Sequence, residues 1–162
     1  MTKPRILIMA GGTGGHIFPA QAVATALNTA GWQIHWLGSS SKMEAQLVPQ
    51  FGWPFHSMDV AGLRGKGLLS LLKAPWMLFK SIRQARRVVQ AVQPDLVLVS
   101  GRDWQQYQDP EAVLSQVPAL TATPAGKNRA IHAIDGHALQ GGLSLRSLQQ
   151  ANQIAQWIKQ GS

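Results

Sequence analysis

Short apolar runs alternate with stretches of helical spacing along this chain. The runs are almost continuously apolar and end in turn residues, which is typical of buried parallel strands, and they cover 5–10, 33–38, 55–58, 95–100 and 130–135. Helical spacing of apolar residues predicts helices over 17–30, 43–51, 75–92, 109–116 and 144–160. Strands that alternate with helices favour a three-layer Rossmann-like α/β fold over residues 1–162. We expect a five-stranded parallel sheet of order 3-2-1-4-5 with helices on both faces.

The helix predicted over 75–92 is amphipathic. Its apolar face, expected in the core, contains Leu78, Ile82, Ala85, Val89 and Val92. Pro75 is expected to separate this helix from the leucine-rich stretch before it.

Composition narrows the class of protein. The chain has 162 residues, of which 45% are apolar and 14% charged, and no cysteine, so its core forms without disulfides and it has no thiolate metal site. No run approaches the about 20 apolar residues of a membrane-spanning helix, and no export signal precedes the first strand. We therefore expect a cytoplasmic protein.

The net charge of +8 is concentrated in one segment. Residues 60–94 contain no acidic residue and seven basic ones, namely Arg64, Lys66, Lys73, Lys80, Arg83, Arg86 and Arg87. Such a cluster attracts phosphates, so an anionic ligand or an anionic membrane surface is the expected partner. Nucleic acid ranks third and is not the expected partner, because no recognition motif or row of stacking aromatics accompanies the charge.

A glycine-rich loop follows the first strand. It consists of Gly11, Gly12, Thr13, Gly14, Gly15 and His16. Glycines let the backbone approach a ligand closely, and the following helix presents free N–H groups, so the loop is a candidate phosphate site. Its spacing matches neither the dinucleotide motif nor the Walker loop, which disfavours NAD and ATP. The alternative is that the glycines only permit a tight turn.

Several polar side chains are further candidates for this site. His16 is suited to act as a general base or a phosphate donor, or alternatively it caps its own helix. Arg64 and Lys66 lie on a glycine-flanked segment and form either a second phosphate clamp or a solvated basic loop. The other histidines, which have no metal-ligand spacing, are interpreted as structural and are His35, His56, His132 and His137.

Apolar and basic residues mix near Pro75 in a way that suits a membrane surface. The predicted patch consists of Leu68, Leu69, Leu72, Lys73, Trp76, Phe79, Lys80 and Arg83. The alternative for the leucines is packing in the core. A patch left without its membrane could also promote self-association.

The first part of the chain resembles a known family. The residues that carry the likeness are ILIMAGGTGGHIFPA, GWQIHWLG, KMEAQLVP, AGLRGKG, KAPWMLFKSIRQARR and PDLVLVSG. Over about residues 3–98 they are similar to the N-terminal acceptor-binding domain of the MurG family, peptidoglycan glycosyltransferases that add N-acetylglucosamine to lipid I. The resemblance implies that Gly14, Gly15 and His16 lie at the acceptor diphosphate, with Arg64 and Lys66 nearby. It also places the patch on the cytoplasmic membrane face.

The remainder resembles a different family. Over about residues 95–159, and most clearly in PALTATPAGKNRAIHAID, the chain is similar to the C-terminal lobe of periplasmic haemin-binding proteins. The second glycine-rich loop of the MurG family is not found after the fourth strand, and its donor-binding domain is absent from the 162 residues. These departures suggest an engineered chimera with a junction near 94–101, joining residues 1–98 to 99–162.

Three functional hypotheses follow. The first is a chimera without catalytic turnover that keeps a remnant phosphate site in the glycine loop, where His16 is the remnant catalytic candidate. The second is the acceptor-binding half of a UDP-N-acetylglucosamine:lipid I transferase that works with a separate donor subunit. The third is a peripheral membrane or haem-binding module. The leading hypothesis requires no cofactor, no metal and no partner.

Overall fold

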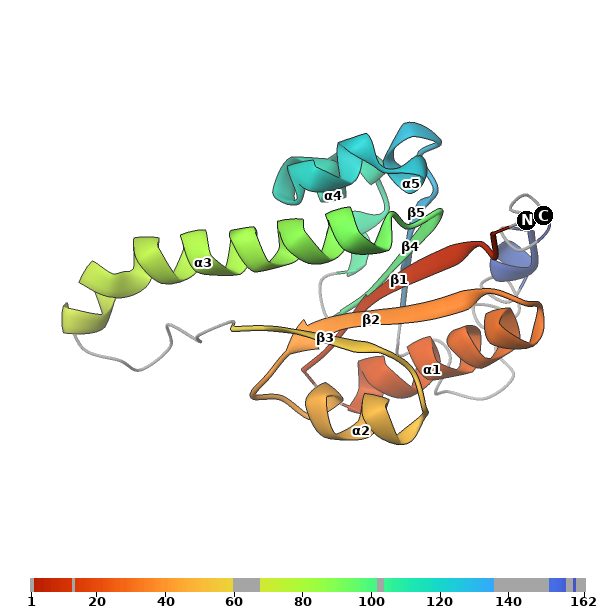
Figure 1. The fold of residues 1–162 in the computed structure, drawn as a ribbon, viewed down its shortest axis with the longest axis horizontal. Helices are drawn as coiled ribbons and strands as arrows, with labels where there is room; N and C mark the ends of the chain where they lie inside the picture. The colour runs from red at the N-terminus through yellow and green to blue at the C-terminus, as the bar shows by residue number, and fades with distance from the viewer. Residues whose placement is uncertain are drawn as a thin grey trace.

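A parallel sheet forms the centre of the structure, which is a computed structural model describing residues 2–12, 14–59, 68–101, 104–135, 152–156 and 159 (Figure 1). Its five strands are ordered β3-β2-β1-β4-β5. They are β1 (Arg5–Ala10), β2 (Gln33–Ser39), β3 (Phe55–Met58), β4 (Leu96–Ser100) and β5 (Ile131–Ile134). Each neighbouring pair is parallel, with Ile6 opposite both Ile34 and Leu96. The predicted strand order is confirmed.

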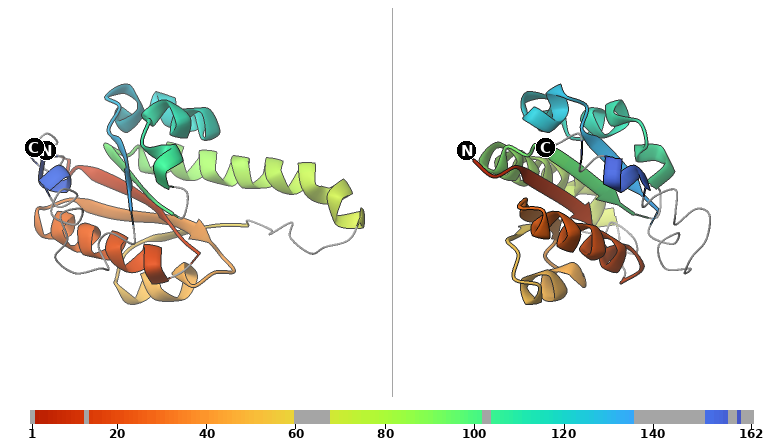
Figure 2. Two further views of the ribbon diagram at one scale, coloured as in Figure 1. Left: turned by 180° about the vertical axis from the view of Figure 1, so that it is seen from behind. Right: turned by 90° about the vertical axis from the view of Figure 1, so that its right-hand side faces the viewer.

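Helices cover both faces of the sheet. They are α1 (Gly14–Thr29), α2 (Glu44–Gln50), α3 (Leu68–Val92), α4 (Pro110–Gln116) and α5 (Pro124–Lys127), with short 3-10 helices η1 (Trp104–Tyr107) and η2 (Pro118–Ala122). The helices α1 and α2 lie on one face, and α3, α4 and α5 lie on the other (Figure 2). This arrangement confirms the three-layer Rossmann-like prediction. Within the described segments, no helix has the length and apolar character needed to cross a membrane.

Two apolar clusters, one on each face, hold the layers together. Alternate residues of β1 contribute to both: Ile6 and Ile8 pack with α1, whereas Leu7 packs with Val89 of α3. This division explains why the central strands are continuously apolar. Ile154, in the helical segment 152–156, packs with the cluster on the α1 face.

Helix α3 differs from its prediction in two ways. It continues through Pro75 rather than starting there, and Leu78 and Ile82, expected in the core, are 63% and 50% exposed. The reason is length, because a helix of 25 residues is about 37 Å long and a strand of six residues only about 20 Å. Half of α3 therefore extends beyond the sheet (Figure 1).

Other boundaries agree with the sequence to within a few residues. Helix α1 begins at Gly14 instead of residue 17 and ends at Thr29, next to the predicted end at residue 30; Gly31, with φ of 94°, follows it. Helix α4 lies within the predicted range 109–116, and Asp109 caps it, since its side chain accepts a hydrogen bond from the Glu111 N–H. Helix α5 and the two 3-10 helices were not predicted. Most of the helix expected over 144–160 lies outside the described residues.

Candidate anion-binding site

The glycine loop lies at the carboxyl edge of the sheet, between the strands where the chain reverses its direction of winding. Strand β1 pairs with β2 on one side and with β4 on the other. The order therefore runs outward from β1 through β2 to β3, and from β4 to β5 on the opposite side. In open parallel sheets, ligands bind in the crevice outside the carboxyl ends of the strands at this switch point.

The backbone of the loop turns sharply into α1. Gly12 has φ of 99°, a conformation that a side chain would strain, and α1 starts two residues later at Gly14. The N–H groups of the first helical turn have no partner within the helix and carry its positive dipole end. An anion placed at this edge would meet them directly. Thr13 lies outside the described residues.

Three buried side chains fix the loop from different elements. The Trp36 indole of β2 donates a 2.8 Å hydrogen bond to the Ala10 carbonyl, and the Ser100 hydroxyl of β4 donates one of 3.3 Å to the His16 carbonyl. From α2, the Glu44 carboxylate accepts hydrogen bonds from the backbone N–H of Gly12, in the loop, and from that of Ser39, the last residue of β2. The loop is thus held from both neighbouring strands and from the helix layer.

Glu44 was not predicted as a site residue. Its side chain is 2% exposed; Oε2 accepts from Gly12 N–H at 3.1 Å and Oε1 from Ser39 N–H at 3.0 Å. Two glycines make room for it, because a Cβ on Gly38 would lie 2.6 Å from the Glu44 Cγ and one on Gly11 would overlap its Oε1. The sequence does contain a signal for this residue. Gly11 directly follows the first strand, Gly38 lies near the end of the adjacent strand, and the acidic Glu44 comes shortly after it.

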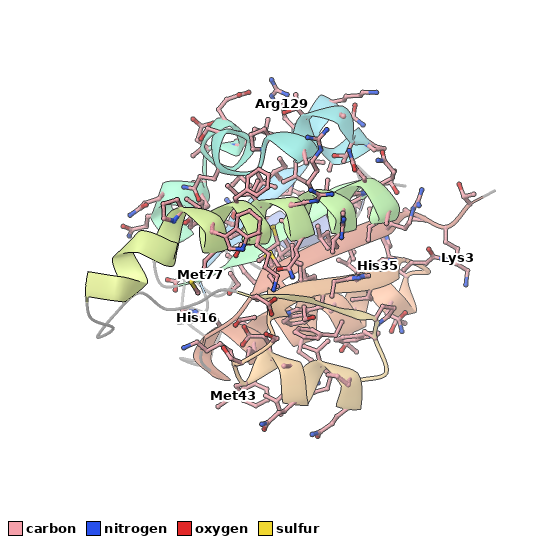
Figure 3. All side chains as sticks on the ribbon, turned by 60° about the vertical axis from the view of Figure 1, so that its left-hand side comes forward. Lys3, His16, His35, Met43, Met77 and Arg129 are labelled. Atoms are coloured by element: carbon pink, nitrogen blue, oxygen red, sulfur yellow. The ribbon has the colours of Figure 1, made fainter. Side chains whose placement is uncertain are left out.

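His16 lies inside the site rather than on its surface. Its side chain is only 6% exposed, within the first turns of α1 (Figure 3). Its carbonyl is the group that Ser100 binds. The catalytic and phosphate-binding roles predicted for His16 remain predictions. Arg64 and Lys66 lie outside the described residues.

The predicted membrane patch is described in part. Trp76 is 72% exposed and Phe79 55% exposed, their ring centroids are 6.2 Å apart, and Arg83 is exposed as well. Four other residues of the predicted patch have side chains that the structure does not describe: Leu68, Leu69, Leu72 and Lys73.

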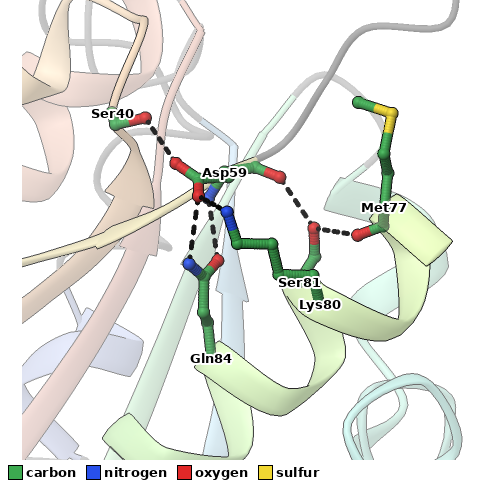
Figure 4. A network of polar contacts seen from close by, with 6 residues as sticks. All are labelled: Ser40, Asp59, Met77, Lys80, Ser81 and Gln84. Atoms are coloured by element: carbon green, nitrogen blue, oxygen red, sulfur yellow. Dashed lines mark hydrogen bonds and ion pairs between the residues drawn. The ribbon is translucent and has the colours of Figure 1, made fainter.

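Lys80 is not a free surface cation, because it pairs with Asp59. Its Nζ lies 2.8 Å from Asp59 Oδ2, and both side chains are more than half exposed. Gln84 Nε2 also donates to Oδ2, the Gln84 Oε1 accepts from the Asp59 N–H, and Ser81 donates to the Asp59 carbonyl (Figure 4). Hydrogen bonds from Lys80 and Gln84, aided by the charge of Lys80, hold the pKa of Asp59 below its usual value. The network ties the end of β3 to the middle of α3.

Two histidines interpreted as scattered are neighbours. His35 Nδ1 and His56 Nε2 lie 3.1 Å apart on adjacent strands, with stacked rings. Burial lowers the pKa of both rings, and for His35 the nearby His56 and Arg5 lower it further. Burial also lowers the pKa of His132 to about 4. In the part of the chain that the structure describes, no three His, Cys, Asp or Glu side chains gather to hold a metal.

The chain matches one protein family over most of its length. The model of the glycosyltransferase family 28 N-terminal domain matches residues 6–122. The chain belongs to this family. The match includes the glycine loop, Glu44 and helix α3, so the site just described is part of a family 28 domain.

Curated relatives and a solved structure agree with the family 28 assignment. A UDP-N-acetylglucosamine--N-acetylmuramyl-(pentapeptide) pyrophosphoryl-undecaprenol N-acetylglucosamine transferase from Ectopseudomonas mendocina is 58% identical over 99 residues, 61% of this chain and 28% of its own length. The enzyme of that name from Shewanella loihica is 44% identical over 142 residues, covering 85% of this chain and 39% of its own length. The crystal structure of Acinetobacter baumannii MurG superposes with a TM-score of 0.57 at 25% identity, covering 92% of this chain and 39% of that one. The chain thus spans about a third of the length of these relatives.

The interpretation of the chain as an engineered chimera is wrong. The family 28 match runs from residue 6 to residue 122, across the junction expected at 94–101, and the Shewanella loihica relative aligns with 85% of the chain. A periplasmic heme-binding protein of Vibrio cholerae superposes at 21% identity with a TM-score of 0.32, which supports no conclusion about the expected likeness to haemin-binding proteins. The departures from the MurG family after the fourth strand were wrongly interpreted as a change of family, since surface loops vary more among relatives than the core strands do.

Proposed function

We propose that this chain is the acceptor-binding part of a transferase that adds N-acetylglucosamine to a pyrophosphoryl-undecaprenol acceptor. The observation that carries the proposal is the position of the glycine loop. It lies at the switch point of the sheet and opens α1, inside a region that matches family 28. A pyrophosphate group is a dianionic ligand of the kind that a helix N-terminus with glycine-rich backbone favours.

Only the acceptor side of the reaction is assigned to these residues. The chain spans 28% to 39% of the two relatives described above, so we assign the binding of the nucleotide-sugar donor to a part of the transferase that these residues do not include. We therefore expect no sugar transfer from UDP-N-acetylglucosamine by this chain alone. Transfer to a lipid-linked acceptor in a radiolabel assay would contradict this assignment.

Calorimetric titration with inorganic pyrophosphate tests the acceptor site. Gly14→Asp places a carboxylate at the first position of α1, where the helix dipole favours it but where it repels an incoming anion. The new Cβ would lie 3.0 Å from the ring of Phe18, which is 51% exposed and free to move aside. We expect the wild-type chain to bind pyrophosphate and Gly14→Asp to bind about tenfold more weakly or worse.

Asn128→Asp is the matched control. It adds the same charge on an exposed residue just before β5, at the opposite edge of the sheet. Its affinity is expected to remain within about twofold of the wild type, because salt screens a charge at that distance. A wild-type chain that does not bind pyrophosphate, or equal losses in both variants, would refute the proposed site.

A second proposal concerns the exposed half of α3, which we assign to contact with an anionic membrane surface. Trp76 and Phe79 present exposed rings next to the basic side chain of Arg83, a combination suited to the boundary between headgroups and acyl chains. Since Lys80 is paired with Asp59, Arg83 is expected to contribute more attraction than Lys80 does.

Sedimentation with phosphatidylglycerol-containing vesicles tests this surface. Trp76→Ala combined with Phe79→Ala should lower vesicle binding by about tenfold or more, because two large apolar side chains no longer enter the interface. Phe18→Ala removes a ring of similar exposure on α1, on the other face of the sheet, and should leave binding unchanged. Equal binding by all three proteins would contradict the proposal.

A further inference from the structure

We propose that Glu44 is a positioning residue of the acceptor site, whose buried carboxylate fixes the glycine loop in the shape that receives the anion. This inference rests on the function proposed above. It concerns a residue that would not contact the substrate and would act through the backbone that does.

The first argument is the cost of placing a carboxylate there. Glu44 is 2% exposed, and a buried carboxylate is strongly unfavourable unless hydrogen bonds compensate for lost water. Each of its oxygens receives one backbone N–H, Gly12 on the loop after β1 and Ser39 at the end of β2. The side chain therefore bridges the loop after β1 and the end of β2.

The second argument is the space cleared for it. Gly11 directly follows β1 and Gly38 lies in β2, and a Cβ on either would collide with the Glu44 side chain. A position that serves only to complement a helix dipole lies on the surface and requires no such space. Here the first residue of α2 points inward, beneath the loop.

The third argument is the division of the loop's N–H groups. Gly12 has φ of 99° and donates its N–H to Glu44, so this N–H is already used within the protein. The N–H groups of the first turn of α1, beginning at Gly14, are then the ones that face a ligand. By holding Gly12, Glu44 sets the orientation of the peptide groups that follow it.

The negative charge of Glu44 opposes anion binding, whereas its positioning of the loop favours it. The two roles therefore predict changes in anion affinity of opposite sign when Glu44 is replaced. A negative charge below an anion site weakens anion binding, so removing it without disturbing the loop would strengthen binding. Glu44→Gln removes the charge, but its amide has one acceptor oxygen for two N–H donors and turns its own N–H₂ toward one of them. A positioning role therefore predicts weaker binding, and a purely electrostatic role predicts tighter binding.

The experiment compares Glu44→Gln with Glu111→Gln by calorimetric titration with inorganic pyrophosphate. Glu111 is an exposed carboxylate on α4, so its replacement makes the same change in net charge away from the loop. We expect about tenfold weaker binding for Glu44→Gln and unchanged or slightly tighter binding for Glu111→Gln. Equal or tighter binding by Glu44→Gln would overturn the proposal.

Two further measurements keep the outcome decisive. If Glu44→Gln does not fold, as judged by near-UV circular dichroism, Glu44→Asp replaces it; this variant keeps the charge but is one methylene too short for both hydrogen bonds, and it should also bind more weakly. If the wild type does not bind pyrophosphate, the proposed function fails, and amide hydrogen exchange decides the role of Glu44. Exchange at Gly12 at least tenfold faster in the variant, with no change at Gly31, supports loop fixation, and equal rates refute it.

Discussion

Helix α3 can be divided between Ile82 and Ala85 into an N-terminal and a C-terminal part, its two halves, which have the same apolar spacing but different surroundings. In the C-terminal half, Ala85, Val89 and Val92 are at most 8% exposed, because they pack on the sheet. In the N-terminal half, Leu78 and Ile82 continue the same stripe yet are 63% and 50% exposed. The helix is one continuous element, so the difference comes from what lies beneath it and not from the helix itself.

Helical periodicity identifies a face of a helix but does not identify what covers that face. The sheet ends near Asp59, whose hydrogen bonds to Ser81 and Gln84 mark the point where α3 leaves it. Among the side chains of this part that the structure describes, the apolar Leu78 and Ile82 and the aromatic Trp76 and Phe79 are all at least half exposed. A surface of this kind is what a membrane-contacting element requires, whereas the other half serves the core.

Paired aspartate substitutions on the two halves should produce the largest contrast. Val89→Asp buries a carboxylate at a position with 0% exposure and is expected to cost about 4 kcal/mol or more, enough to prevent folding. Ile82→Asp changes an exposed position and should alter the free energy of unfolding by no more than about 0.5 kcal/mol. Urea unfolding followed by circular dichroism measures both.

One result would contradict the comparison of the two halves. If Ile82→Asp destabilises the chain by several kcal/mol, the N-terminal half of α3 is covered in solution, by a second copy or by another segment. The comparison of the two halves would then be wrong.

The sheet was predictable because its signals are local. Each central strand is an apolar run such as Arg5–Ala10, buried on both faces and ended by a glycine or a turn. The prediction that Leu78 and Ile82 lie in the core was wrong. The sequence does not show where the sheet ends, so it does not show how much of α3 the sheet covers. Pro75 was expected to separate the helix from the leucine-rich stretch before it, yet α3 continues through Pro75, at the cost of one backbone hydrogen bond.

The site was predictable only where it is contiguous in sequence. The loop from Gly11 to His16 can be identified from its glycines, which are close together in the sequence. Glu44 does not, because its partners Gly12 and Ser39 come from two different strand ends that only the sheet brings together. The neighbouring histidines His35 and His56 were missed for the same reason.

A smaller effect, on the pKa of Asp59, is expected where the ion pair between Asp59 and Lys80 joins the end of β3 to α3. Because the pKa of Asp59 is lowered in the folded chain, its ion pair with Lys80 contributes stability above about pH 3.9, the value of an unfolded aspartate, and loses it as the pH falls through the folded value. Lys80→Gln should raise the pKa of Asp59 toward its usual value in a carboxyl NMR titration, with Lys127→Gln as the control. An unchanged titration would mean that the pair does not form in solution.

The smallest effect concerns the residue that ends the buried half of α3. Gln93 has φ of 47°, in the left-handed region that favours glycine, directly after the last helical residue. Gln93→Gly relieves this strain and should raise the free energy of unfolding by about 0.5–1 kcal/mol, less the exposed hydrogen bond that Gln93 Nε2 donates to the Gln90 carbonyl. Gln93→Ala loses the same hydrogen bond but keeps a Cβ, so it should be no more stable than the wild type. The order glycine above alanine in urea midpoints is the decisive result, because it separates backbone strain from the side-chain contact; the reverse order would show that this end of α3 is not strained.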